Sequence, residues 1–248
     1  MARWPRAAAL QSQPVDPLRQ LLSALTPWDW GAVAAFFVAW IGYARFAHRR
    51  SAVKPSLLAA SNRVRRQWML EATRRENRVF DGVVVQNLSA SPSFFASTSI
   101  LIIGGLLAVL STTDKAIEFV REVPFAARTT VLVFDLKLVL LLAIFVFAFF
   151  RFTWSLRQYS FGALLVAAAP PHTELQEEAA RNAFAQRAGR VMGLAAESFN
   201  DGLRAYYMAF AATAWFFSPW AMLVGTAGVV WILFRREFHS EVLDALSA

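Results

Sequence analysis

The sequence predicts an all-α polytopic membrane protein: a four-helix transmembrane bundle with a cytoplasmic helical layer and both termini outside. Three observations predict this class. Hydrophobic residues make up 57% of the chain, with 22 Phe and 9 Trp, which is more than a soluble domain usually carries. Four runs reach the length of about 20 apolar residues that a helix needs to cross a bilayer. Basic residues cluster between the first two runs, a pattern that orients membrane proteins.

The basic cluster sets the predicted orientation. Residues 45–78 carry ten basic and two acidic side chains, an excess equal to the formal charge of +8 of the whole chain. Short loops rich in Lys and Arg stay in the cytoplasm. If the loops after the first and third spans lie inside, sixteen basic residues are on the inner side and eight are on the outer side. We therefore expect a multi-pass protein of the bacterial inner (plasma) membrane.

The first span is expected at about 30–46, at the start of a single membrane domain, 28–248, that follows an outer N-terminal segment, 1–27. No charge lies between Asp29 and Arg45, and Trp28 and Trp30 form an interfacial aromatic pair. No apolar stretch with a cleavage site follows the basic N-terminus, so an uncleaved anchor is expected. Residues 1–27 fit either a surface flap with an amphipathic piece at 17–25 or a disordered tail.

The first inner loop, about 56–90, has the pattern of an amphipathic helix. Apolar residues recur at helical spacing, at Val64, Trp68, Ala72, Val79, Val83 and Leu88. The opposite face is basic, which suits anionic lipid headgroups. The alternative, in which this helix packs on other cytoplasmic helices of the protein, has equal support. Attachment to the membrane makes lipid phosphate a nearer partner than nucleic acid, which basic stretches also bind.

The second span, about 91–110, is rich in small polar residues, among them Ser97 and Thr98. Such residues allow close helix packing in lipid, and they can also line a hydrated path. Ser91 and Pro92 form a helix-start pattern. A kink in one continuous helix is the alternative.

The third span, about 131–150, carries Asp135 and Lys137 near its outer end. Burying a charged side chain in a membrane-spanning segment costs free energy, so such residues often have a functional role. Lys137 is expected to extend its amine outward, and Asp135 to pair with Arg235 or Arg236. A structural ion pair and a solute or proton site are both open interpretations.

Helices covering about 151–205 are expected in the cytoplasm. The apolar pattern of the third span continues to 169, where Pro170 and Pro171 end it, so this helix would be about 58 Å long and project from the bilayer. Thr173 and Gln176 then form a capping box. The helix that follows has an apolar face expected to pack near Trp68. The fourth span is expected at about 206–234, kinked by Pro219.

Polar residues from three segments are predicted to meet at the inner membrane face, as a structural clamp or as an anion or lipid-headgroup site. Arginines there would offer paired donors to phosphate or carboxylate. The candidates are Asn77, Arg78, Asp81, Asn87, Arg151, Arg157, Gln158, Asn200, Asp201 and Arg204. Asn77 and Asp81 are four residues apart and are expected to share a helix face.

The residue inventory gives no sign of a cofactor or metal. The chain has no Cys, which excludes disulfides and thiolate metal sites. Its three His are far apart in sequence, and no phosphate loop, nucleophile elbow or HExxH motif occurs. We expect no catalytic residue, no metal and no cofactor.

Several sequence blocks carry a family resemblance: RRENRVFD (74–81), SFFASTSILIIGGLLAVL (93–110), FTWSLRQYSF (152–161), GLRAYYMAF (202–210) and RREFHSEVL (235–243). Together they resemble a family of bacterial and plant multi-pass membrane proteins known only as domain of unknown function five hundred and ninety-nine. The resemblance covers about residues 30–243 and implies a helical membrane protein without an assigned reaction.

Three classes of function follow. The leading one is a non-enzymatic membrane module, either an accessory subunit of an unidentified membrane protein or a homo-oligomer. The second is an oligomeric channel or transporter for a small solute or ion, in which Ser97, Thr98 and Asp135 would face water or a subunit axis. The third is a membrane enzyme acting on lipid, with Asp81 or Asp201 in a closed pocket.

Overall fold

The computed structural model describes residues 24–51, 56–113, 130–171, 173–174 and 177–247, and every regular element in these ranges is helical. The all-α prediction is therefore confirmed. The α-helices are α2 (Pro27–Ser51), α3 (Leu57–Ala72), α4 (Val79–Ser111), α6 (Val131–Ala167), α7 (Glu178–Thr213), α8 (Pro219–Phe238) and α9 (Glu241–Ser247), and the 3₁₀ helix η1 covers Ala214–Phe216. The predicted segment 1–27 and the connection between the second and third predicted spans, 111–130, lie largely outside the described residues.

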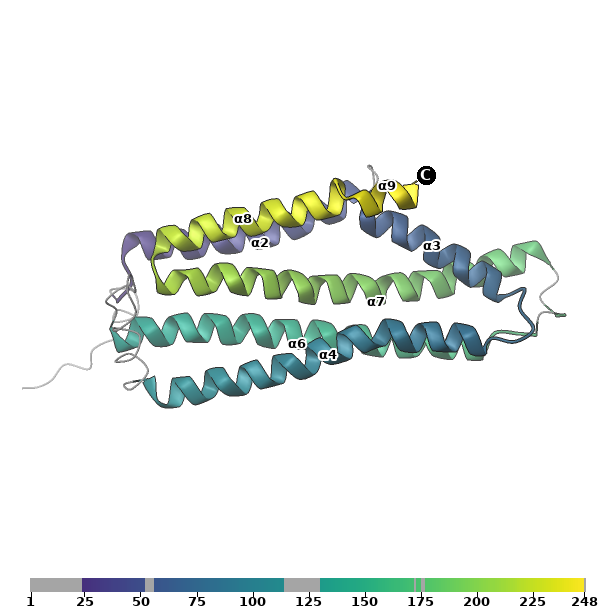
Figure 1. The fold of residues 1–248 in the computed structure, drawn as a ribbon, viewed down its shortest axis with the longest axis horizontal. Coiled ribbons are helices and arrows are strands. Elements are labelled where there is room, and N and C mark those ends of the chain that lie inside the picture. The colour runs from purple at the N-terminus through teal and green to yellow at the C-terminus, as the bar shows by residue number, and fades with distance from the viewer. Residues whose placement is uncertain (1–23, 52–55, 114–129, 172, 175–176, 248) are drawn as a thin grey trace, which may run out of the picture.

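The long helices lie side by side in an elongated bundle (Figure 1). Helix α4 packs on α6, α6 on α7, and α7 on α8, while α8 also pairs with α2. At one end α3 diverges from the α2–α8 pair and crosses over α7. Between α4, α6 and α7 the interior is filled by aromatic rings, with Phe95 and Phe152 at 5.4 Å and Phe152 and Tyr206 at 5.5 Å between centroids.

Three described helices are long and apolar enough to cross a membrane: Pro27–Arg50, Val79–Ser111 and Val131–Ala167. They contain the first three predicted spans. Many of their large apolar side chains point away from the protein, as Val38, Leu101 and Phe150 do. Exposed apolar surface of this extent needs a cover, and a bilayer supplies it.

The fourth predicted span, 206–234, is wrong because the chain reverses within it. Helix α7 ends at Thr213, η1 follows, and Ser218 caps α8 by accepting a hydrogen bond from the amide of Ala221 at 3.0 Å. Pro219 occupies the first turn of α8, where its missing N–H costs nothing, and does not kink a continuous helix. Residues 206–234 thus form a helical hairpin.

The reversal makes α8 run parallel to α2. The rings of Trp28 and Trp220 lie 5.0 Å apart at one end of the pair, and those of Phe46 and Phe234 lie 6.3 Å apart at the other. Helix α9 then packs on α3. The C-terminal helix and the start of α2 therefore lie at opposite ends of the α2–α8 pair. This contradicts the prediction that both termini lie on the side away from the basic inner loop.

The predicted inner helix 56–90 divides into α3 and the first third of α4. Helix α3 ends where the Thr73 hydroxyl donates to the Leu70 carbonyl at 2.6 Å. Pro92 is buried inside α4, so the helix start predicted at Ser91 is wrong and the alternative of one continuous helix is confirmed. Only the second half of α4 coincides with the predicted span 91–110.

Helix α6 runs unbroken over 37 residues, about 55 Å at 1.5 Å per residue, as the sequence predicts. Helix α7 begins at Glu178, later than the predicted capping box, of which Gln176 lies outside the described residues. Its apolar face packs on α3, where Met69, Phe184 and Ala188 are buried together, as expected. Gly189 allows this contact, because a Cβ there would lie 2.9 Å from the Cα of Arg66.

Candidate functional site

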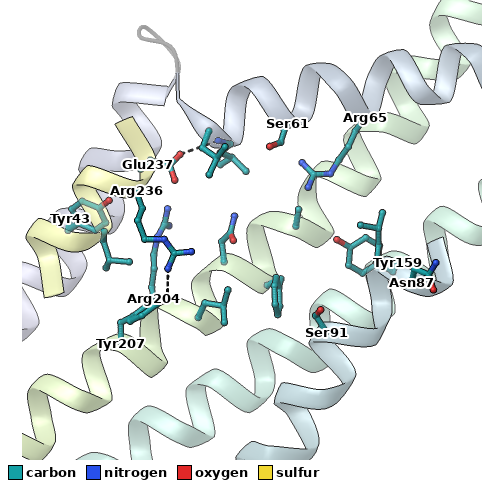
Figure 2. A pocket seen from close by; sticks show the side chains of 18 residues that line it. Tyr43, Ser61, Arg65, Asn87, Ser91, Tyr159, Arg204, Tyr207, Arg236 and Glu237 are labelled. Atoms are coloured by element: carbon teal, nitrogen blue, oxygen red, sulfur yellow. Dashed lines mark hydrogen bonds between the residues drawn. The ribbon is translucent and has the colours of Figure 1, made fainter. Parts of the chain in front are cut away.

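A polar cavity of about 360 Å³ lies where α3 crosses the bundle (Figure 2). Its walls come from α2, α3, α4, α6, α7 and α8. The polar residues that line it are Tyr43, Ser61, Arg65, Asn87, Ser91, Tyr159, Asn200, Arg204, Tyr207, Arg236 and Glu237. We call it the arginine cavity, because three guanidinium groups face one carboxylate.

Two of the three arginines have no acidic partner. The ion pairs among the described residues are Arg74–Glu71, Arg75–Asp81, Arg151–Asp201 and Arg204–Asp201. Arg65 instead donates to the Asn62 side-chain oxygen at 3.0 Å, and Arg236 donates to the Tyr207 hydroxyl. The cavity therefore has a positive potential that an anion would neutralise.

Arg65 is partly buried, which makes its unpaired charge less favourable than it would be in water. Removal from solvent lowers the pKa of the Arg65 guanidinium, while Tyr159 and Glu197 act in the opposite direction. The ordinary pKa of arginine lies so far above neutrality that the group stays charged. Arg65 thus holds a partly desolvated positive charge against the cavity.

A buried hydroxyl in the cavity wall also lacks a partner. Tyr43 is only 7% exposed, and its hydroxyl makes no hydrogen bond to any described residue. A polar atom left unsatisfied in this way costs about 1–3 kcal/mol. The Arg204 guanidinium lies 5.9 Å from the Tyr43 ring centroid, so the hydroxyl sits beside the cationic groups. An oxyanion in the cavity would supply the missing acceptor.

The structure brings together part of the predicted polar network. Arg151 of α6 and Arg204 of α7 both bind the carboxylate of Asp201, with Arg204 at 3.1 Å. Beside them the Ser198 hydroxyl donates to Gln158 at 2.7 Å. Asn87 and Asn200 reach the arginine cavity. Arg157 stands apart, exposed over the ring of Phe161.

The polar residues at the start of α4 form a separate cluster. Asp81 is fully buried and accepts hydrogen bonds from Arg75 and from the Trp68 indole at 2.8 Å. Arg78 donates to the carbonyls of Ala169 and Pro170, each at 2.6 Å, which ties α4 to the end of α6. This cluster holds helices together.

Asn77 does not share a helix face with Asp81, contrary to the prediction, because α4 begins at Val79. Its side-chain oxygen instead accepts from the Val79 amide at 2.9 Å.

The two charges predicted within the third span have other partners than expected. Asp135 accepts a hydrogen bond from Thr113 at 2.8 Å, whereas Arg235 and Arg236 lie at the far end of α8. Lys137 does not reach outward. It is 3% exposed, with its amine 5.4 Å from the centroid of the Trp215 ring.

The small polar residues of α4 divide between two faces. Ser97 is exposed, and the Thr98 hydroxyl donates to the Phe94 carbonyl of its own helix. Ser99 makes the contact between helices, 2.9 Å from the Tyr206 hydroxyl. Self-association through the exposed face stays a prediction.

Sequence reasoning missed most of the polar lining of this cavity, including Tyr43, Arg65, Tyr207 and Arg236. Tyr43 and Tyr207 each stand within a few residues of an arginine inside an apolar run, which is a weak signal. Arg236 was assigned to the outer side, so only the reversal of the chain at 214–218 brings it here. No group of His, Cys or carboxylates suited to a metal ion occurs in the described ranges.

An all-helical fold with three long, apolar and largely exposed helices indicates an α-helical membrane protein, and the cavity at one end of the bundle gives it a polar site. The chain belongs to the family described as protein of unknown function, DUF599, which matches residues 31–242. No curated protein and no solved structure matches it significantly.

Proposed function

We propose that five segments cross the bacterial inner membrane: α2, the second half of α4, the first half of α6, the end of α7, and α8. The start of α2 faces outward, and α3, α9 and the C-terminus face the cytoplasm. The reversal at 214–218 moves Arg235 and Arg236 to the inner side. With four spans, sixteen basic residues lie inside and eight outside. With five spans, eighteen lie inside and six outside, and Lys137 lies within the bundle in both counts. This larger bias supports the orientation.

Within this topology the protein acts as a non-enzymatic membrane module that binds an anionic group, a phosphate or carboxylate, in the arginine cavity. The observation that carries this proposal is a cavity lined by Arg65 and Arg236, neither in an ion pair, and by the unpartnered hydroxyl of Tyr43. Guanidinium groups bind such anions through paired, charge-assisted hydrogen bonds.

The position and the apolar lining of the cavity favour a lipid headgroup as the anion. Leu88, Leu203 and Leu233 line the wall together with the polar groups. The proposed cytoplasmic face of the membrane is also where anionic lipids concentrate. A site with cationic and aliphatic walls at that depth suits the junction of a headgroup and its chains.

The enzyme alternative has less support. Asp81 and Asp201, the carboxylates that a lipid-modifying reaction would use, are both bound by arginines.

The test is a binding titration on the purified protein in detergent. A short-chain phosphatidylglycerol is added in one arm and inorganic phosphate in the other, and binding is followed by calorimetry. Arg65→Gln and Arg236→Gln should each weaken lipid binding about tenfold, because each removes a charge-assisted hydrogen bond. Arg63→Gln is the matched control, since Arg63 is exposed on the same helix and does not line the cavity.

Binding of the lipid but not of phosphate would identify a headgroup with its chains as the ligand. Equal binding of both would point to a free phosphate. Equal affinities for the lipid in the wild type and both cavity variants would refute the proposal.

A further inference from the structure

An apolar groove of about 400 Å³ runs between α2 and α6, on the membrane-embedded part of the bundle. Phe37, Trp40, Ile41, Leu140, Ala143 and Phe147 line it. Helix α2 packs on α8, and its Trp40 meets the ring of Phe147 edge-on at 5.6 Å across the groove. The groove has the size of a small ligand site.

The groove opens at one end into a second polar cavity, of about 510 Å³, which adjoins the arginine cavity and shares Leu58, Asn200, Arg204 and Glu237 with it. Ala44, Arg45, Asp201 and Arg204 line both the groove and this second cavity. We call the second cavity the headgroup cavity. An apolar channel that ends in a charged chamber matches a molecule with a hydrocarbon tail and a charged head.

The charges of the headgroup cavity are of both signs, unlike those of the arginine cavity. Asp201 is already neutralised by Arg151 and Arg204. Arg45 and Glu197 also line the cavity, and neither takes part in an ion pair among the described residues. Glu197 accepts a long hydrogen bond from Asn62, at 3.4 Å, and otherwise interacts with the more distant charge of Arg65. Arg49 and Glu237 line the cavity too, and neither is in an ion pair among the described residues, so cationic and anionic groups both remain available to a ligand.

We propose that this site holds one phosphatidylethanolamine molecule of the bilayer. Its phosphate binds Arg45, its ammonium group binds Glu197, and one acyl chain occupies the groove between α2 and α6. Charge complementarity selects this occupant, because a headgroup with both signs pairs both residues and a purely anionic headgroup leaves Glu197 unpaired. Arg45 and Glu197 do not line the arginine cavity, so this site adjoins that cavity with ligand contacts of its own and goes beyond the function proposed for it.

The test measures the lipid retained by the full-length protein after extraction from nanodiscs that contain equal amounts of phosphatidylethanolamine and phosphatidylglycerol. Native mass spectrometry counts the bound molecules. In addition to any phosphatidylglycerol bound in the arginine cavity, the wild type should retain one phosphatidylethanolamine. Arg45→Gln and Glu197→Gln should each lower its retention about tenfold, because each removes one charged partner.

A third variant tests the tail independently of charge. Ala143→Phe fills the groove without altering a charged group and should also displace the lipid, whereas Ala35→Phe, at an exposed position of α2 outside the groove, should not. Arg236→Gln, at a residue that lines only the arginine cavity, should leave the retention of phosphatidylethanolamine unchanged, which separates the two sites.

Equal retention of the two lipids by the Arg236→Gln variant, in which the arginine cavity is weakened, or undiminished retention of phosphatidylethanolamine by Ala143→Phe, would overturn the proposal and indicate only annular lipid. Thermal unfolding of each variant in the same detergent verifies that it is folded.

Discussion

At the scale of single residues, buried charges decide how the ends of the helices are joined. Asp81 is the clearest case, since one carboxylate of α4 binds the Trp68 indole of α3 and the Arg75 guanidinium of the connection between them. Removing it leaves the indole donor without its acceptor in a buried position.

We expect Asp81→Ala to lower the free energy of unfolding by about 2 kcal/mol, the cost of hydrogen bonds to a buried charged group. Denaturation in mixed micelles, followed by circular dichroism, measures it. Glu71→Ala is the control, because the Glu71–Arg74 pair is exposed and such pairs contribute about 0–1 kcal/mol. A similar loss in both variants would show that Asp81 has no special structural role.

A second residue-scale contact lies at the opposite end of the bundle. The Trp215 indole donates to Asp29 at 2.8 Å, and its ring lies against the amine of Lys137. Trp215→Phe keeps an aromatic face for Lys137 and removes only the donor. The expected loss of stability is about 1–2 kcal/mol, by the same denaturation assay.

Trp231→Phe serves as the comparison for Trp215→Phe, because Trp231 is 60% exposed. It should change stability by no more than about 0.5 kcal/mol. An equal effect of the two substitutions would mean that the bond to Asp29 contributes nothing.

At the scale of helices, the contact between α3 and α7 depends on glycine. A Cβ at Gly189 would meet the backbone of Arg66, which cannot move without shifting the whole of α3. Since α3 forms one wall of the arginine cavity, its distance from α7 also sets the shape of that site.

Gly189→Ala should therefore destabilise the protein, because overpacking costs about 1–3 kcal/mol and outweighs the gain of up to about 1 kcal/mol in helix propensity. Gly82→Ala should have the opposite sign, since no atom lies within 4 Å of a Cβ at Gly82 in α4. Thermal unfolding compares the two. A stabilising Gly189→Ala would show that α3 is free to move away from α7.

At the scale of the whole molecule, the fold places the basic helix α3 and the C-terminal helix α9 together. The absence of cysteine from the chain makes this simple to test with single introduced cysteines. In intact cells, a membrane-impermeant thiol reagent should label the Thr112→Cys variant. It should label the Gln67→Cys and Glu241→Cys variants only after permeabilisation.

The reverse labelling pattern would mean that the orientation is inverted. Labelling of Glu241→Cys without Gln67→Cys in intact cells would contradict the packing of α9 on α3 itself.

The sequence by itself determined the helical class and the first three apolar segments. These depend on hydropathy and on helical period, which are local properties of the chain. It also determined the unbroken length of α6 and the apolar face of α7 that meets α3. The family resemblance likewise rested on local blocks, and the family match confirms it.

Only the tertiary structure decided where a helix continues and where the chain turns. The dipeptide Ser-Pro occurs at 91–92 and at 218–219, each within an apolar region. Pro92 lies inside α4 and is buried, whereas Pro219 begins α8 after a reversal. Because the local signal is the same, long-range contacts decide the outcome: Trp220 packs on Trp28, and Phe216 packs on Phe134. The same reversal brings Arg236 to Arg65 and so creates the arginine cavity.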